Sequence, residues 1–276
     1  MTTTPSAAAA AGPLIRDDIP HSARVWNYWL GGKDYYEIDR IAGDAGIEIY
    51  PGIIDVARHS REVLLRVVRF VVRECGIRQI LDIGPGLPGM SNTHEVAQGI
   101  EPSARVVYVD SDPLVLTHAR ALLTSTTPEG VVGVVDADLR DSAGLLAAAY
   151  ATLEPGEPVA ILLMGVLGYV SWDEARYAVQ ALRAAVPDGS YLAIWDGVTT
   201  CEAHTRWWDL YPETGATPYR LTSPAGLESL FSGTELVTPG VVPIDRWRPT
   251  RTRFTGDRGA LPAQGGLGRI HGGRAW

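Results

Sequence analysis

The sequence predicts an α/β protein built on a doubly wound, mostly parallel sheet. From position 78 onward, short apolar runs end in an acid or a glycine, and helical patterns separate them. Alternation at this spacing is typical of parallel strands joined by crossover helices that cover both faces of a sheet. A glycine-rich turn after the first run indicates a ligand site at the carboxyl ends of the strands.

Two helices are predicted ahead of the sheet. The first covers about 22–30, with Ser22 suited to cap its start and Gly31 suited to end it. The second covers about 53–75, where apolar residues follow a helical period. Residues 1–20 are rich in Ala, Thr, Pro and Ser without periodicity, so we expect a disordered lead there.

Five strands and their connecting helices follow in order. The strands are QILDIG, RVVYVD, VVGVVDAD, VAILLMG and SYLAIWD, and the helices are expected at about 92–100, 113–124, 141–151 and 173–186. After a helical pattern near 223–231, the run ELVTPGVVPI predicts closing strands, antiparallel at the sheet edge. From Pro249 the chain is rich in Gly and Arg without apolar periodicity, and we expect a loose tail.

Composition restricts the class of function. A net charge of -8 and a pI near 5.3 argue against nucleic-acid binding, which uses clustered Lys and Arg, and they favour a small-molecule substrate. The alanine run at 7–11 does not fit an export signal, and the apolar run at 159–170 is too short to span a membrane. Cys75 and Cys201 form no disulfide framework, which fits a cytoplasmic location. Monomer and homodimer both stay open.

The strongest chemical signal is the turn LDIGPGLPG at 81–89. Gly84, Gly86 and Gly89 satisfy GxGxxG, which is a weak match on its own. Asp82, two residues before the first glycine, would repel the pyrophosphate of a dinucleotide but could pair with the ammonium of an amino-acid moiety. This acid therefore favours S-adenosylmethionine over NAD.

Acids at two further strand ends support the same site. Asp110 is suited to accept hydrogen bonds from both ribose hydroxyls, a role common to both ligand classes, and Asp138 could bind the adenine amino group. The alternative is that these acids cap turns and helices, as Asp does well. Asp136 and Asp141 compete with Asp138 for the adenine role.

These residues resemble the class I methyltransferases, and within them the actinobacterial S-adenosylmethionine-dependent family DUF574. The stretches that carry the resemblance are PHSARVWNYWLGGKDYY, LDIGPGLPGMSNTHEVAQ, ARVVYVDSDPLVLTHARALL, DADLRD, PDGSYLAI and PGVVPIDRWRP, which together cover roughly 20–249. The resemblance implies a Rossmann-like, seven-stranded sheet with added N-terminal helices. It also implies S-adenosylmethionine as cofactor, held by Asp82, Gly84, Gly86, Asp110 and Asp138.

The resemblance also divides the chain and extends the cofactor site. We expect a lead at 1–20, an N-terminal helical lid segment at 21–76, an S-adenosylmethionine-binding methyltransferase domain at 77–248 and the tail at 249–276. We assign Ser111, Leu139 and Gly165, which lie at the ends of three strands or just beyond them, to the cofactor site as well.

The stretch WNYWLGGKDYY at 26–36 contains the chain's only lysine, Lys33. Its GGK lacks the spacing of a phosphate-binding loop. The resemblance makes it a signature segment that folds over the cofactor end of the sheet, so Tyr28, Gly31 and Lys33 become candidate contacts to the cofactor's carboxylate or the acceptor. Arg24 and Tyr28 are four residues apart and are expected to share the helix face toward this pocket.

Two departures from the family pattern fall on the acceptor side. Gly168 stands where relatives typically have a histidine, and Trp195 and Asp196 stand where they tend to have an SH-like pair. Tyr169 follows the fourth strand, where its phenol could orient an acceptor or contact the sulfonium through a cation-π interaction.

Candidate bases and substrate contacts come from several segments. Tyr169, Asp196 and His94 are the candidate general bases. The HEVAQ at His94 lacks the second histidine of HExxH, so we expect no metal. The candidate substrate contacts are aromatic: Tyr28, Tyr169, Trp195, Trp207 and Trp208. Core packing is an equal alternative for Trp207 and Trp208, as it is for Trp26 and Trp29.

The leading functional hypothesis is an S-adenosylmethionine-dependent methyltransferase that acts on a small molecule, with specialised metabolism as its setting. The first alternative is a lyase, cyclase or aminocarboxypropyl transferase that releases methylthioadenosine, motivated by the two departures. A non-catalytic S-adenosylmethionine-binding protein is a further alternative. An NAD-dependent oxidoreductase ranks last because of Asp82.

Overall fold

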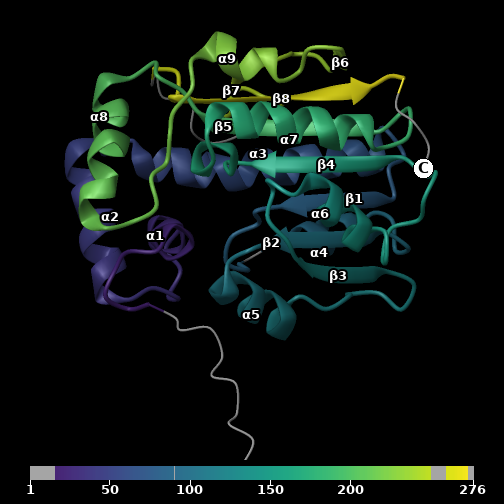
Figure 1. Ribbon diagram of the computed structural model, residues 1–276, viewed down its shortest axis with the longest axis horizontal. Coiled ribbons are helices and arrows are strands. Elements are labelled where there is room, and N and C mark those ends of the chain that lie inside the picture. The colour runs from purple at the N-terminus through teal and green to yellow at the C-terminus, as the bar shows by residue number, and fades with distance from the viewer. Residues whose placement is uncertain (1–15, 90, 250–258, 273–276) are drawn as a thin grey trace, which may run out of the picture.

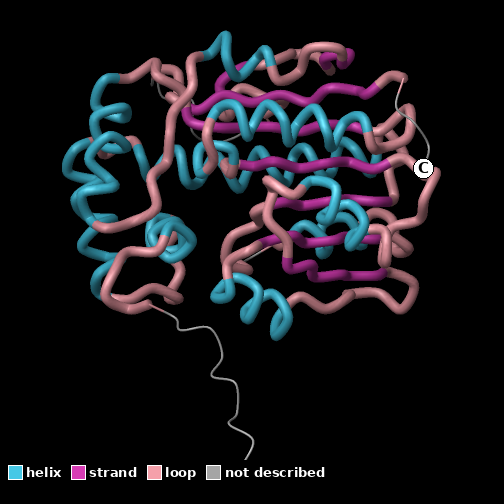
Figure 2. The backbone as a smooth tube through the Cα atoms, viewed as in Figure 1, coloured by secondary structure: helices cyan, strands magenta, loops and turns pink. Residues whose placement is uncertain are grey.

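A single mixed sheet forms the centre of the computed structural model, which describes residues 16–89, 91–249 and 259–272 (Figures 1 and 2). Seven strands follow the order β3-β2-β1-β4-β5-β8-β6, and a short β7 pairs with β8. Strands β1 to β5 are parallel to one another, whereas β8 runs antiparallel to β5, β6 and β7. The strands are β1 Gln79–Ile83, β2 Arg105–Asp110, β3 Val131–Asp136, β4 Val159–Met164, β5 Tyr191–Gly197, β6 Thr234–Leu236, β7 Val242–Pro243 and β8 Ala263–Ile270. The predicted doubly wound, mostly parallel sheet with an antiparallel edge is confirmed.

Helices cover both faces of the sheet. They are α1 Ser22–Trp29, α2 Glu37–Ile49, α3 Ile53–Arg73, α4 Thr93–Gln98, α5 Pro113–Leu122, α6 Ser142–Ala149, α7 Trp172–Ala184, α8 Glu202–Leu210 and α9 Pro224–Ser229, with 3-10 turns η1 Leu167–Tyr169 and η2 Tyr211–Thr214. All seven helices expected from periodicity are present, with ends shifted by a few residues. No helix among the described residues is long and apolar enough to cross a membrane.

The sequence analysis missed α2 and α8. In α2, Gly43 and Gly46 resemble helix breakers, but both lie where another side chain needs their space. A Cβ on Gly43 would come within 2.5 Å of the Tyr28 ring, and one on Gly46 within 2.8 Å of Trp207. Helix α8 is nine residues long and too short for its pattern of buried aromatics to stand out.

The expectation of a loose tail from Pro249 is wrong for 263–270, which form β8 between β5 and β6. Glycines replace the alternating side chains of a typical strand in β8, because neighbouring side chains approach its backbone too closely for a Cβ atom. A Cβ on Gly265 would lie 2.6 Å from the Trp195 Cβ, and one on Gly268 would lie 2.2 Å from the Thr234 Oγ1. The rest of that expectation at 250–258 and 273–276, and the predicted lead at 1–15, lie outside the described residues; residues 16–20 form no helix or strand.

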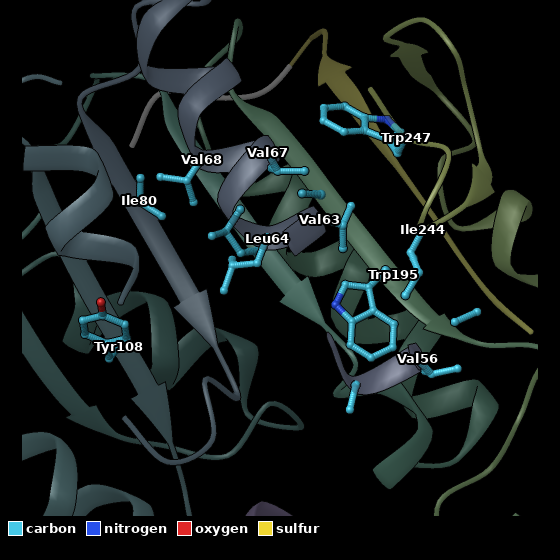
Figure 3. Close-up of a cluster of buried hydrophobic side chains, with 14 of the residues drawn as sticks. Val56, Val63, Leu64, Val67, Val68, Ile80, Tyr108, Trp195, Ile244 and Trp247 are labelled. Atoms are coloured by element: carbon cyan, nitrogen blue, oxygen red, sulfur yellow. The ribbon is translucent and has the colours of Figure 1, made fainter. Parts of the chain in front are cut away.

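Two apolar layers hold the helices to the sheet. On one face, α3 is the main helix, and its side chains Val63, Leu64, Val67 and Val68 pack toward strand residues such as Ile80 (Figure 3). On the other face, α6, α7 and α9 pack against the alternate residues of the same strands. Helices α1, α2 and α8 extend the α3 layer with buried side chains that include Trp29, Ala42 and Trp207. They lie beyond the end of the sheet toward which the β4 arrow points, which is the carboxyl end of the parallel strands (Figure 1).

Candidate functional site

The turn after β1 is built for close approach of a ligand. Gly84 and Gly86 have φ angles of 68° and 69°, a region that favours glycine. The Gly84 N–H donates to Val109 O at 2.8 Å, which ties the turn to the end of β2. A Cβ on Gly84 would strike Val166, whereas one on Gly86 would meet no atom within 4 Å. Gly86 therefore borders open space at the carboxyl end of β1.

Asp82 lies just before this turn, buried in β1. The hydroxyl of Thr93, at the start of α4, donates to Asp82 Oδ2 at 2.6 Å. Burial raises the pKa of Asp82 to about 6, partly offset by the Thr93 hydrogen bond and the charge of Arg61. A buried carboxylate with few donors is suited to receive a cation, because an ammonium group would replace the hydration that the carboxylate has lost.

Asp110 ends β2, the strand next to β1. The Asp112 N–H donates to Asp110 Oδ1 at 2.9 Å, and burial raises the pKa of Asp110 to about 6. Asp112 accepts from the backbone N–H groups of Leu114 and Val115 and so caps α5. The exposed Ser111 lies between the two acids. The buried carboxylate of Asp82 and the half-buried carboxylate of Asp110 thus border the glycine turn.

Asp138 is already paired. Arg140 Nε donates to Asp138 Oδ1 at 2.9 Å, and this hydrogen bond lowers the pKa of Asp138. The competing Asp141 caps α6 by accepting from the Gly144 N–H at 3.0 Å. An adenine amino group at Asp138 would therefore share the carboxylate with Arg140. Leu139, beside it, is buried in the apolar layer under α6.

Helix α1 lies across the strand ends. Before its first residue, His21 Nε2 lies 2.6 Å from Asp112 Oδ2, at the β2 side. At the far side, the rings of Trp26 and Trp195 are 6.0 Å apart, which connects α1 to β5. The helix therefore links the β2–α5 loop to the end of β5, two strands beyond β1 in the sheet. Gly31, with φ 78°, follows its last turn, as predicted.

The face of α1 that was expected to point at the pocket instead packs on α2. Arg24 forms a buried ion pair with Asp39 at 2.6 Å, so the expectation that Arg24 faces the pocket is wrong. The Tyr28 hydroxyl donates to Asp44. Lys33 is exposed. Contacts of Tyr28, Gly31 and Lys33 with a ligand stay predictions.

The two departures from the family pattern are coupled through Tyr219. A Cβ on Gly168 would lie 2.5 Å from the Tyr219 ring, so glycine makes room for that ring. The Tyr219 hydroxyl donates to Asp196, which also accepts from the N–H groups of Leu167 at 3.0 Å and of Gly197 at 3.0 Å. Burial raises the pKa of Asp196 to about 6. These bonds make Asp196 an anchor for η1 and for the segment around Tyr219.

His94 is directed into the protein. Its backbone N–H donates to the Tyr108 hydroxyl at 2.9 Å, and its Nδ1 lies 2.9 Å from the same oxygen. Burial lowers the pKa of His94. All three candidate bases are buried within the protein: His94 and Asp196 are held by internal hydrogen bonds, and the Tyr169 hydroxyl interacts with Trp26 and Ser22 of α1. A role as base stays a prediction for all three.

Eight aromatic side chains, here called the aromatic cluster, gather beside the ends of β4 and β5. They are Trp26, Trp29, Tyr169, Trp195, Trp207, Trp208, Tyr211 and Tyr219. Trp195 is fixed against Gly165, whose φ is 84° and where a Cβ would lie 2.5 Å from the indole. Four of the five predicted substrate residues meet here, and the fifth, Tyr28, contacts Tyr35 instead. Tyr219 lies in none of the motifs found in the sequence, and His21 lies in the stretch PHSARVWNYWLGGKDYY, where no local pattern indicates its contact with Asp112.

A parallel sheet in this strand order, with a glycine turn after β1 and acids closing β1 and β2, is the framework of the class I methyltransferases. Comparison with known proteins narrows this class. The family model for S-adenosyl methyltransferases matches residues 8–271. The chain belongs to the S-adenosyl methyltransferase family, and S-adenosylmethionine is its cofactor.

Two crystal structures share the whole fold. A DUF574 family protein from Streptomyces avermitilis is 38% identical, with a TM-score of 0.87, and the match covers 92% of this chain and 98% of that one. A proposed methyltransferase from Thermobifida fusca is 40% identical, with a TM-score of 0.84, over 92% of this chain and 96% of that one. The search of curated proteins found no match.

Proposed function

We propose that the protein methylates a small molecule, with the cofactor held over the glycine turn between Asp82 and Asp110. The observation that carries this proposal is the pair of carboxylates with raised pKa at the ends of adjacent strands, on either side of a turn that Gly86 leaves open. In this arrangement Asp82 pairs with the ammonium of the cofactor's amino-acid moiety, and Asp110 accepts from the ribose hydroxyls.

The cofactor supplies an activated methyl group on a sulfonium. A lone pair of the acceptor forms the new bond to the methyl carbon, the electron pair of the broken sulfur–carbon bond stays on sulfur, and S-adenosylhomocysteine remains. An acceptor that loses a proton releases it to water or to a nearby base. The residues of this chain mainly bind and align the two partners, and they exclude water from between them. Trp195, fixed against Gly165, and Tyr169 are suited to border the acceptor.

The alternative reaction, which releases methylthioadenosine, loses its motivation. The departures at Gly168 and Asp196 serve the packing and hydrogen bonding of Tyr219, so they need no change of chemistry to explain them. Only a measurement of turnover separates a methyltransferase from a protein that binds the cofactor without catalysis. We also infer a cytoplasmic location, supported by two free cysteines.

Incubation with methyl-labelled S-adenosylmethionine and a panel of neutral phenols and amines tests the proposal. We expect label in an organic product and an equal amount of S-adenosylhomocysteine. Methylthioadenosine as the main product would contradict methyl transfer. Tight cofactor binding with no product from any acceptor would favour the silent binding protein.

A further inference from the structure

Three buried polar atoms of the aromatic cluster have no hydrogen-bond partner in the described chain. They are the hydroxyl of Tyr211 and the indole N–H groups of Trp195 and Trp207. The buried Tyr169 hydroxyl belongs to the same cluster and interacts with Trp26 and Ser22 of α1. The side chains of Trp195, Trp207 and Tyr211 are at most 4% exposed. Buried polar atoms in folded proteins are nearly always paired, and each exception needs an explanation. Three exceptions within one cluster indicate partners that the polypeptide does not supply.

Other polar atoms of the same cluster are satisfied. Trp29 Nε1 donates to Gly43 O at 3.1 Å, and Trp208 Nε1 donates to His204 Nε2 at 2.8 Å. Tyr219 donates to Asp196. The cluster is therefore hydrogen-bonded where it contacts α2, α8 and β5, and the three unpaired atoms do not reflect generally loose packing.

The unpaired atoms lie beside the expected position of the methyl acceptor. Trp195 packs on Gly165 at the end of β4, and Tyr169 follows in η1. The phenols of Tyr169 and Tyr211 are close enough to interact electrostatically. Trp207 contacts Tyr211, with ring centroids 5.4 Å apart. The donors thus extend from the strand ends outward to α8 and η2.

The chemistry of these atoms limits the ligand. An indole N–H can only donate, so the ligand must bring hydrogen-bond acceptors, while the phenols can donate or accept. In the described chain the nearest charged groups are already matched: Arg24 pairs with Asp39, and Asp196 accepts three hydrogen bonds. A ligand with a net charge would find no free counter-charge there. Aromatic walls favour a planar ring.

We propose that the acceptor substrate is a neutral, planar aromatic molecule with at least two oxygen acceptors, bound within the aromatic cluster by the indole N–H groups of Trp195 and Trp207 and the phenols of Tyr169 and Tyr211. This inference rests on the proposed function. The rings are closely packed, so α8 must move relative to α1 for such a molecule to enter. This movement would separate Trp29 of α1 from Trp207 and Trp208 of α8, whose rings contact it at centroid distances of 6.3 and 6.0 Å.

Coumarin is a suitable probe, because it is neutral and planar and carries two oxygens. Naphthalene, of similar size, has no acceptor, and coumarin-3-carboxylate is anionic. Binding of each is measured by calorimetry and saturation-transfer NMR with S-adenosylhomocysteine present. The variants Tyr169→Phe and Tyr211→Phe each remove one hydroxyl and keep the ring. Tyr177→Phe, an exposed tyrosine on α7, is the matched control.

We expect coumarin to bind more tightly than the other two probes, and each cluster variant to weaken it about 3- to 10-fold. Tyr177→Phe should leave binding unchanged, and naphthalene should not respond to any variant. Failure of coumarin to bind, or equal binding to wild type and Tyr211→Phe, would overturn the inference. If Tyr211→Phe gains thermal stability and binds coumarin as tightly as wild type, these atoms are unpaired polar atoms of the core and not part of a binding site. The affinity for S-adenosylhomocysteine is measured separately. Failure of this compound to bind would count against the proposed function and not against this pocket.

Discussion

His21 lies 2.6 Å from Asp112, and this contact joins the segment before α1 to the loop that carries Asp110. Together with the contact between Trp26 and Trp195, it holds α1 across the carboxyl ends of the strands. The helix is thus fastened on both sides of the glycine turn. Opening of α1 would expose the site to solvent.

Replacement of His21 tests this fastening. We expect His21→Ala to raise the dissociation rate of S-adenosylhomocysteine about 3- to 10-fold, because loss of one polar contact frees the start of α1. Stopped-flow measurement of cofactor release checks this. His118→Ala, on the partly exposed side of α5, is the control. Equal release rates for wild type and His21→Ala would show that the contact does not hold α1 over the site.

Cofactor affinity should depend on pH through Asp82 and Asp110. Burial raises the pKa of each to about 6, so both are ionised at pH 7 and become protonated as the pH falls below 6. The ionised forms bind the ammonium and the ribose hydroxyls, so affinity should fall by about tenfold per pH unit for each group below pH 6. Calorimetry between pH 7.5 and 5 measures the slope. Asp82→Asn should bind more weakly and keep only the slope of Asp110, and an unchanged slope would assign the titration elsewhere.

The steric relation between Gly168 and Tyr219 predicts a coupling energy. Gly168→Ala should destabilise the protein by about 1–3 kcal/mol, because its Cβ would lie 2.5 Å from the Tyr219 ring. In a Tyr219→Ala background the same change should cost little. Chemical unfolding of the single and double variants gives the coupling directly. Additive effects would mean that Tyr219 does not require the glycine.

Loss of the Tyr219 hydroxyl has a separate effect. Tyr219→Phe keeps the ring but removes a donor from the buried Asp196, and we expect a loss of about 1–3 kcal/mol of unfolding free energy. The exposed Tyr177→Phe should change stability by much less. A neutral outcome for Tyr219→Phe would show that the backbone N–H groups alone satisfy Asp196.

His204 predicts a loss of stability in acid. Burial lowers its pKa to about 4, and its Nε2 accepts from Trp208 at 2.8 Å. The unfolded chain protonates this histidine below about pH 6.5, whereas the folded protein does not until about pH 4, so the unfolded state binds more protons in this window. Stability should therefore fall between pH 6.5 and 4, by about 3 kcal/mol from this group.

A matched variant isolates this effect from other titrating groups. His204→Gln keeps an acceptor for Trp208 but does not titrate. We expect the difference in unfolding free energy between wild type and variant to shrink as the pH falls from 7 to 5. A constant difference would mean that His204 is not held neutral by the fold.

The sequence predicted the sheet because its strands are continuous apolar runs. It also predicted S-adenosylmethionine as the cofactor, from a local motif followed by acids at successive strand ends, and the residues that hold this cofactor stay a prediction. It failed at β8, where glycines that permit contact with Trp195 and Thr234 obscure the strand pattern. It also failed at Asp196 and Tyr219, 23 positions apart, which only the fold brings together. Contacts of this kind form only when the tertiary fold brings distant segments together, and they leave no periodic pattern in the local sequence.

Calorimetry of S-adenosylhomocysteine with wild type, Asp82→Asn, Asp110→Asn and Asp141→Asn tests the central claim most directly. Asp141 caps α6 and provides a matched loss of one carboxylate away from the glycine turn. We expect Asp82→Asn and Asp110→Asn to weaken binding about 10- to 100-fold, as expected for loss of a charged hydrogen-bond acceptor, and Asp141→Asn to bind like wild type. Wild-type affinity in both Asp82→Asn and Asp110→Asn would contradict the account of how this protein holds its cofactor.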